Sequence, residues 1–178
     1  EMQSRPGFVP DADETDATLR THLNLPANNP RTRALAEQWR RETGQAAGQN
    51  EAVIRRMLDH FRQESFFYTL TPPLLGENGI DQFLFETRRG FCEHYASAFV
   101  FAMRAAGIPA RVVTGYQGGE RNPIDGYLIV RQSDAHAWAE AWLEGRGWVR
   151  VDPTAAVAPN RIEAGLASAV PAGEPLPF

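Results

Sequence analysis

The spacing of apolar side chains predicts helices in the first part of the chain and strands in the second. Up to residue 106, apolar positions recur mostly every three or four residues, the pattern of helices with one buried face. The predicted helices cover residues 30–43, 50–61 and 91–106. From residue 110 the period becomes two, which is typical of strands. With one short aromatic stretch added, the predicted strands cover residues 65–70, 110–116, 127–131, 136–143 and 148–152.

Residues that favour helix ends support these boundaries. Asn29 before a proline is typical of a helix start, and Gly107 with Pro109 ends the central helix. Asp81 is expected to cap a short helix that packs ahead of the central one. The loop 71–79 is rich in proline and glycine, and we expect it to form a wall of a substrate cleft.

The length of 178 residues predicts one domain. Its core is expected at about residues 28–158, where the periodic segments lie. Residues 1–27 are predicted to be an extended lead-in, and residues 159–178 a Pro/Ala-rich tail that wraps the surface or stays disordered.

Charge and cysteine content exclude several classes of function. The net charge is −4 and no basic stripe interrupts the mixture of signs, so nucleic acid is not an expected partner. A single cysteine excludes an internal disulfide and a cysteine-based metal cluster. An acidic cluster lacks the spacing of a calcium loop, so we interpret it as solvated surface and expect no metal site: Asp11, Asp13, Glu14 and Asp16.

Cys92 is the first candidate for chemistry. It follows Gly90-Phe91 and lies in the first turn of the predicted central helix. Unpaired N–H groups and the helix dipole favour an anion there, which promotes the reactive thiolate. The alternative is that Cys92 is a small buried apolar residue, as free cysteines often are. This stretch alone leaves both interpretations open.

A reactive thiol needs a base, and the chain has four histidines. His94 is two residues from Cys92 on the same helix, so the two side chains point to different sides. His22 in the lead-in and His60 on the polar side of a helix are expected to be solvated. His136 opens a predicted strand and is therefore the preferred base.

A carboxylate is predicted to lie beside His136. If the turn spans residues 143–147, Trp142 pairs with Trp148, and Asp152 lies diagonal to His136 on the same face of a hairpin. A shift of the register by one residue would send Asp152 to the opposite face. Cys92, His136 and Asp152 would then form a nucleophile, a base and an orienting carboxylate.

These three residues and their surroundings resemble the transglutaminase-like superfamily, whose folds are papain-like. Three motifs occur in order and make the resemblance specific over about residues 50–156. They are Gly90-x-Cys92 followed by 105–116, His136-Ala137-Trp138-x-Glu140, and Gly147-Trp148-x-x-Val151-Asp152-Pro153-Thr154. The resemblance implies an α+β fold in which N-terminal helices and a central nucleophile helix pack on an antiparallel sheet.

The resemblance also implies a function. It suggests a transglutaminase that forms a thioester from glutamine and transfers the acyl group to primary amines. Its partners would be protein or peptide substrates bearing glutamine and lysine. The backbone N–H of Cys92 is the expected first oxyanion donor. Tyr68 or a tryptophan would supply a second donor, and Trp138 would form a cleft wall. The calcium-dependent animal enzymes have Gln-Cys-Trp where Phe91-Cys92-Glu93 stands here. We therefore expect neither calcium nor any other cofactor.

Residues 83–94 are similar to a bacterial branch of the superfamily whose members carry this domain between transmembrane segments, facing the periplasm. The chain begins at Glu1 rather than at methionine, so we expect a periplasmic segment of a larger, membrane-embedded protein. Two other functions stay open from the sequence. One is a cysteine protease or amidase that uses the same triad with water, and the other is a non-catalytic binding module. Retention of all three triad residues argues against the binding module.

Overall fold

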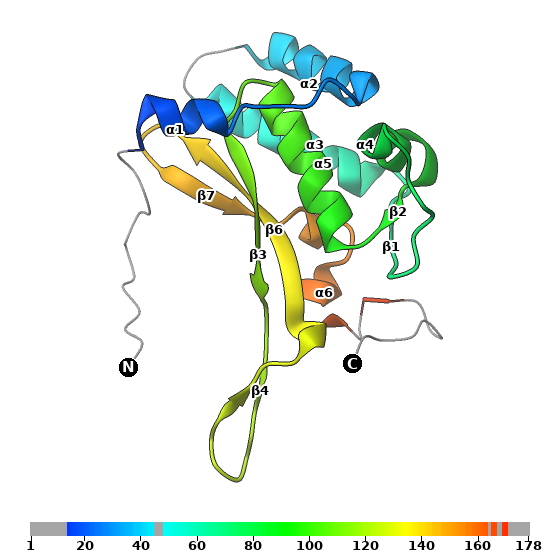
Figure 1. Ribbon diagram of the computed structural model, residues 1–178, viewed down its shortest axis with the longest axis vertical. Coiled ribbons are helices and arrows are strands. Elements are labelled where there is room, and N and C mark those ends of the chain that lie inside the picture. Colours follow the sequence, from blue (N-terminus) through cyan, green and yellow to red (C-terminus); the bar gives the residue numbers. More distant parts are fainter. Residues whose placement is uncertain (1–13, 45–47, 164, 167–168, 171–178) are drawn as a thin grey trace.

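A three-stranded antiparallel sheet forms the centre of the molecule (Figure 1). Its strand order is β3-β6-β7, so β6 is the middle strand. The strands are β3 (Ala110–Tyr116), β6 (Ala135–Leu143) and β7 (Gly147–Val151). The computed structural model describes residues 14–44, 48–163, 165–166 and 169–170.

The central helix α5 (Cys92–Ala105) packs on β6 through small residues. Ala137, Ala139 and Ala141 alternate along β6 and are all buried, while the residues between them lie on the other face. Because alanine side chains are short, α5 approaches the sheet closely. The N-terminal end of α5 therefore lies near the start of β6.

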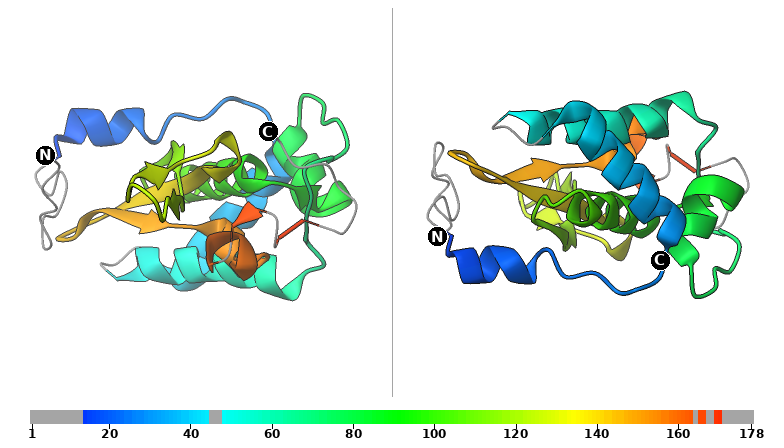
Figure 2. Two further views of the ribbon diagram at one scale, coloured as in Figure 1. Left: turned by 90° about the horizontal axis from the view of Figure 1, so that it is seen from below. Right: turned by 90° about the horizontal axis from the view of Figure 1, so that it is seen from above.

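The remaining helices surround this unit. They are α1 (Asp16–Thr21), α2 (Pro30–Thr43), α3 (Gln49–Gln63), α4 (Gly79–Gln82) and α6 (Pro159–Glu163). Figure 2 shows α1 and α3 on opposite sides of the molecule, with the sheet and α5 between them. A π-helical turn, η1 (Phe83–Thr87), continues α4, and two 3₁₀ turns, η2 (Gln132–Asp134) and η3 (Pro153–Ala156), flank the strands.

An aromatic cluster fixes the start of α5. Tyr95 of α5 lies edge-on to Phe61 of α3 and Phe83 of η1, with ring centroids 5.3 and 5.1 Å apart. Phe66 contacts Phe61 edge-on at 5.0 Å. Such edge-to-face pairs add specific geometry to the burial of large rings. The first turn of α5 is thus held by side chains from two other segments.

Two short parallel strands bring a tyrosine beside the start of α5. In β1 (Phe67–Tyr68) and β2 (Arg89–Gly90), Tyr68 is paired with Gly90. The N–H of Thr69 donates to the carbonyl of Gly90 at 3.0 Å. Tyr68 therefore lies opposite Gly90, the residue two positions before Cys92.

A two-stranded hairpin of β4 (Glu120–Arg121) and β5 (Leu128–Ile129) projects from one end of the sheet (Figure 1). The sequence predicted a surface loop over 117–126 and a strand over 127–131. The structure shortens that strand and pairs it with β4 rather than with the central sheet, because the hairpin closes within the loop.

The α+β class, the three longer helices and the strands of the central sheet are confirmed. The predicted strand at residues 65–70 is reduced to two residues, because only β2 is available to pair with it. The described part of the lead-in contains the helix α1 rather than only extended chain. The described part of the tail begins with α6, and Leu166 after it is buried in the core.

The caps of α2 and α4 differ from the prediction, because the start of each helix is capped by a side chain from the start of the other. Asp81 accepts from the backbone N–H groups of Arg31 and Thr32 at 2.9 and 2.7 Å, and so caps α2 rather than its own helix. In return, the side-chain oxygen of Asn29 accepts from the N–H groups of Ile80 and Asp81. The two helix starts therefore stabilise each other across about fifty residues of sequence.

We predict that Asp81→Ala lowers the free energy of unfolding by about 2–3 kcal/mol, because buried N–H groups at the start of α2 lose their hydrogen-bond acceptor. For a chain of this size the melting temperature should fall by roughly 5–10 °C. Asp59→Ala is the control, since Asp59 is half exposed and pairs only with Arg62 on the surface. Equal melting temperatures for the two variants would contradict this account of the cap.

Candidate active site

Cys92 is the first residue of α5, and the chain enters it in an extended conformation at Phe91. Its side chain is 8% exposed and packs with Ala96 and Ala137. The N–H groups of a first helical turn have no partner within the helix and, with the dipole, favour negative charge. The two interpretations from sequence are therefore compatible: the thiol is packed, and it lies where a thiolate is stabilised.

His136 and Asp152 are brought together by the β6–β7 pairing. Trp142 pairs with Trp148, as predicted, and the same register continues to the end of β7. His136 Nε2 lies 2.8 Å from Asp152 Oδ2. The predicted placement of Asp152 on the face of His136 is confirmed.

The chemistry of this contact assigns the protons of the ring. An ionised carboxylate only accepts, so Nε2 donates its proton to Asp152, and Nδ1 is the basic nitrogen of the neutral ring. Nδ1 is buried and has no hydrogen-bond partner among the described residues, while His136 and Cys92 line the same cleft. Burial lowers the pKa of His136, and the interactions with Asp152 and Cys92 outweigh it, so the net pKa is raised.

Other side chains cover the outer side of this pair. Arg150 Nη2 lies 3.3 Å from the same oxygen of Asp152, and its guanidinium stacks 4.4 Å above the ring of Trp138. Trp138 in turn stacks on His136, with ring centroids 6.3 Å apart. Gly115 allows this arrangement, since a Cβ there would lie 2.9 Å from Trp138. Trp138 therefore covers His136 and is not among the described residues that line the cleft.

The cleft at Cys92 has a volume of about 260 Å³. Cys92, His136 and Tyr68 line it together, with Leu70 and Leu166 among its apolar walls. Tyr68 is 6% exposed; burial raises its pKa, and the nearby backbone N–H of Cys92 acts in the opposite direction. The structure thus places one of the two predicted oxyanion candidates, Tyr68, beside the reacting centre.

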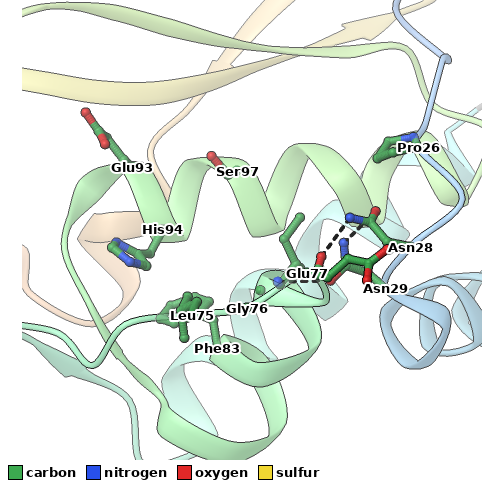
Figure 3. Close-up of a pocket in the computed structure, with 12 residues that line it drawn as sticks. Pro26, Asn28, Asn29, Leu75, Gly76, Glu77, Phe83, Glu93, His94 and Ser97 are labelled. Atoms are coloured by element: carbon green, nitrogen blue, oxygen red, sulfur yellow. Dashed lines mark hydrogen bonds between the residues drawn. The ribbon is translucent and has the colours of Figure 1, made fainter.

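A larger cavity of about 420 Å³ adjoins the first turn of α5 (Figure 3). Glu93 borders both cavities, whereas His94 and Ser97 line only the larger one. The loop 71–79 lines this cavity, where Asn28 donates to the carbonyl of Glu77 at 2.8 Å. The expectation that this loop walls the cleft of the nucleophile is therefore wrong, because the loop packs against the opposite part of the helix start.

The other three histidines contact aromatic rings or the local backbone. His94 accepts from the N–H of Phe91 at 3.4 Å. His22 lies edge-on to Trp148, and His60 packs against Trp39 and Phe66. Burial lowers the pKa of both His22 and His60. The expectation of a solvated side chain is wrong for His60, whose Nε2 is buried among aromatic rings, whereas His22 is only half-buried.

Within the described ranges, no group of three or more potential ligands could hold a metal ion. Of the acidic cluster, Asp11 and Asp13 lie outside the described residues, while Glu14 accepts from Trp148 Nε1 at 3.1 Å. No helix in the described part of the chain is long and apolar enough to span a membrane.

Comparison with known proteins agrees with this site. The family model of the transglutaminase-like superfamily matches residues 34–153, and the chain belongs to this superfamily. Over 150 residues it is 56% identical to the protein-glutamine gamma-glutamyltransferase of Pseudomonas aeruginosa, which covers 84% of this chain and 22% of that protein. It is also 36% identical to the uncharacterised protein YebA of Bacillus subtilis, covering 75% of this chain and 19% of that protein.

The fold is similar to the crystal structure of the periplasmic domain of TgpA from Pseudomonas aeruginosa. The TM-score is 0.85 and the identity 51%, over 91% of this chain and 55% of that chain. The chain spans about a fifth of the length of the two curated relatives, from Pseudomonas aeruginosa and Bacillus subtilis. The family match ends at Pro153, so it does not include α6.

One residue of α6 gave no signal in the sequence. Arg161 is fully buried next to the cleft, yet it lies in a Pro/Ala-rich segment without periodicity and outside the three motifs. The sequence does not single out Arg150 either, because an arginine at an exposed strand position is ordinary. Both residues acquire their surroundings only from the tertiary structure.

We predict that Gly90→Ala displaces the start of α5. A Cβ at Gly90 would lie 2.7 Å from Cβ and Cγ of His94 and 3.0 Å from the ring of Phe83. The resulting overpacking should cost about 1–3 kcal/mol in unfolding free energy and slow the alkylation of Cys92 by iodoacetamide. Gly79→Ala is the matched control, because its nearest neighbour, Leu75 Cβ, is at an ordinary 3.4 Å. If the two variants behave alike, crowding at Gly90 is not what fixes the site.

We also predict that Asp152→Asn lowers the pKa of His136. The variant removes a hydrogen-bonded negative charge that favours the imidazolium, so the ring should lose its proton at lower pH than in the unmodified protein. An NMR titration of the His136 ring measures this directly. Asp125→Asn on the exposed hairpin is the control, and its His136 titration should match that of the unmodified protein. An unchanged or higher pKa in Asp152→Asn would contradict the assignment of the carboxylate.

Proposed function

We propose that this domain is a protein-glutamine gamma-glutamyltransferase with Cys92 as nucleophile, His136 as general base and acid, and Asp152 as the carboxylate that orients His136. The observation that carries the proposal is the 2.8 Å contact of His136 with Asp152, at a cleft that His136 lines together with Cys92 of α5. The identity of 56% to a relative with this name supports the choice of reaction.

In the first step, His136 Nδ1 takes the proton of Cys92 and the thiolate attacks the side-chain amide of a glutamine. The imidazolium that forms is stabilised by Asp152, which keeps Nε2–H directed toward its carboxylate. Collapse of the tetrahedral intermediate breaks the C–N bond, and His136 returns its proton to the departing ammonia. The product is a thioester between Cys92 and the glutamine carbonyl.

The oxyanion of this intermediate would be bound at the start of α5. The backbone N–H of Cys92 is free of helical partners and is the first donor. The hydroxyl of Tyr68, which lies beside that N–H, is the second donor. Trp138 covers His136 instead, so we assign it a supporting position in the packing of the base.

A primary amine, such as the side chain of lysine, then attacks the thioester and forms an isopeptide bond. His136 takes a proton from the amine and the thiol of Cys92 is restored. The side chain of His136 has no exposed surface, and apolar residues wall much of the cleft. Limited access of water favours the amine as acceptor over hydrolysis. The substrates are therefore proteins or peptides that bear glutamine and lysine.

We further propose that the domain works in the periplasm as part of a membrane-embedded protein. The support is the similarity to the periplasmic domain of TgpA, together with the small share of the curated relatives that this chain covers. The proposed reaction uses only side chains and backbone groups of this domain.

We predict that a fluorescent primary amine is incorporated into a glutamine-rich protein in the presence of this domain, and that Cys92→Ala abolishes incorporation. Asp59→Asn, on the surface of α3, is the control and should label at the rate of the unmodified protein. His136→Ala should reduce labelling by roughly 10³-fold or more, since the thiolate loses its base.

Two outcomes would overturn the proposal. If mass spectrometry finds Cys92-dependent deamidation or cleavage without labelling, water is the acceptor and the domain is a hydrolase. If the folded domain forms no acyl-enzyme with any glutamine donor or active ester, the domain is a binding module.

A further inference from the structure

Among the described residues, Arg161 of α6 is the largest side chain that is fully buried, with an exposed fraction of 1%. Its Nη2 donates to the carbonyl of Ala135 at 2.8 Å, but Nε and Nη1 are buried without hydrogen-bond partners. Among the described residues, no carboxylate forms a salt bridge with it. A buried cation without a partner is costly, and natural proteins rarely keep one without a reason.

Arg161 lies directly behind the catalytic cleft. Ala135, whose carbonyl it binds, lines that cleft together with Tyr68 and precedes His136. The first two residues of α6, Pro159 and Asn160, line a neighbouring cavity together with Tyr68. The positive charge of the guanidinium is near enough to act on the pKa of Tyr68, which it lowers. A single tyrosine thus separates the buried charge from Cys92.

Tyr68 is influenced in opposite directions by its surroundings. Burial and the charge of Cys92 raise the pKa of Tyr68 to about 12, while Arg161 and the N–H of Cys92 act to lower it. Tyr68 therefore stays protonated at neutral pH and keeps a proton to donate. Its ring is also held, because it stacks on Tyr95 at an interplanar angle of 10°.

The direction of that proton follows from the donors around it. The guanidinium of Arg161 is positively charged and can only donate, so it attracts the oxygen of Tyr68 and repels the proton. The proton of Tyr68 then points away from the guanidinium. We propose that Arg161 is a positioning residue that directs the Tyr68 O–H into the cleft, where it donates to the oxyanion formed at Cys92.

This inference rests on the oxyanion role proposed for Tyr68, and it explains the missing counter-charge. The negative charge that would compensate Arg161 exists only during the reaction, on the oxyanion that Tyr68 contacts. A preorganised charge of this kind stabilises a transition state without reorganisation at the moment of reaction. A purely structural arginine, tying α6 to β6 through Ala135, would act on folding and not through Tyr68.

A double-mutant cycle separates these two roles. We compare Arg161→Met, Tyr68→Phe and the double variant by the burst of p-nitrophenol from p-nitrophenyl acetate, which reports acylation through an oxyanion. Alkylation of Cys92 by iodoacetamide, which forms no oxyanion, is measured in parallel. Arg62→Met on the surface of α3 is the matched control for the substitution itself.

We expect Tyr68→Phe to lower the ratio of acylation to alkylation rates by about 10²-fold, as for loss of one oxyanion donor. Arg161→Met should lower it by about 10-fold, and the double variant should match Tyr68→Phe within about 2-fold. Arg161→Lys keeps a buried cation and a donor, so its ratio should be several-fold above that of Arg161→Met. Arg62→Met should equal the unmodified protein.

Additive losses in the double variant, or equal falls in acylation and alkylation, would overturn the inference, because Arg161 would then act on the whole site rather than through Tyr68. If Arg161→Met does not fold, the same cycle is run with Arg161→Lys. Its loss must vanish in the Tyr68→Phe background, or the inference is wrong. The ester assay needs no amine, so a hydrolase would fail the proposed function and still pass this test.

Discussion

The hydrogen-bonded contact between His136 and Asp152 is the constraint on which the rest of the site depends. It exists because β6 and β7 pair with Trp142 opposite Trp148, and a shift by one residue would move Asp152 to the other face. The same contact sets the tautomer of the ring, and thereby leaves Nδ1 as the nitrogen that can accept a proton. The alanine face of β6 then determines where α5 lies, so a single strand positions both the base and the helix of the nucleophile.

The electrostatics of the site divide into two halves. On one side of the cleft, the negative Asp152 stabilises positive charge on His136, and Arg150 lies outside it near the solvent. On the other side, the start of α5, Tyr68 and the buried Arg161 all favour negative charge near Cys92. The arrangement matches the charges of a thiolate–imidazolium pair and of the intermediate that follows it.

The sequence predicted most of what positions the triad, because those signals are local or periodic. Alternation over 136–143, the short turn and the strand ending at Asp152 were sufficient to predict the register. Exchange of the caps between Asn29 and Asp81 could not be predicted, since it depends on two helix starts meeting in space. Arg161 was missed for a related reason: a lone arginine in a Pro/Ala-rich segment gives no pattern, and its burial arises only when α6 folds over the cleft.

Trapping the thioester between glutamine and Cys92 tests the proposed mechanism most directly. The domain is mixed with a glutamine peptide, quenched in acid within a turnover, and digested for mass spectrometry. We predict that the fragment containing Cys92 gains the mass of the peptide less ammonia, and that a primary amine added before the quench removes the adduct and yields the amide product. A Cys92 fragment that stays unmodified while the peptide is converted would contradict the account, because the chemistry would then not pass through this thiol.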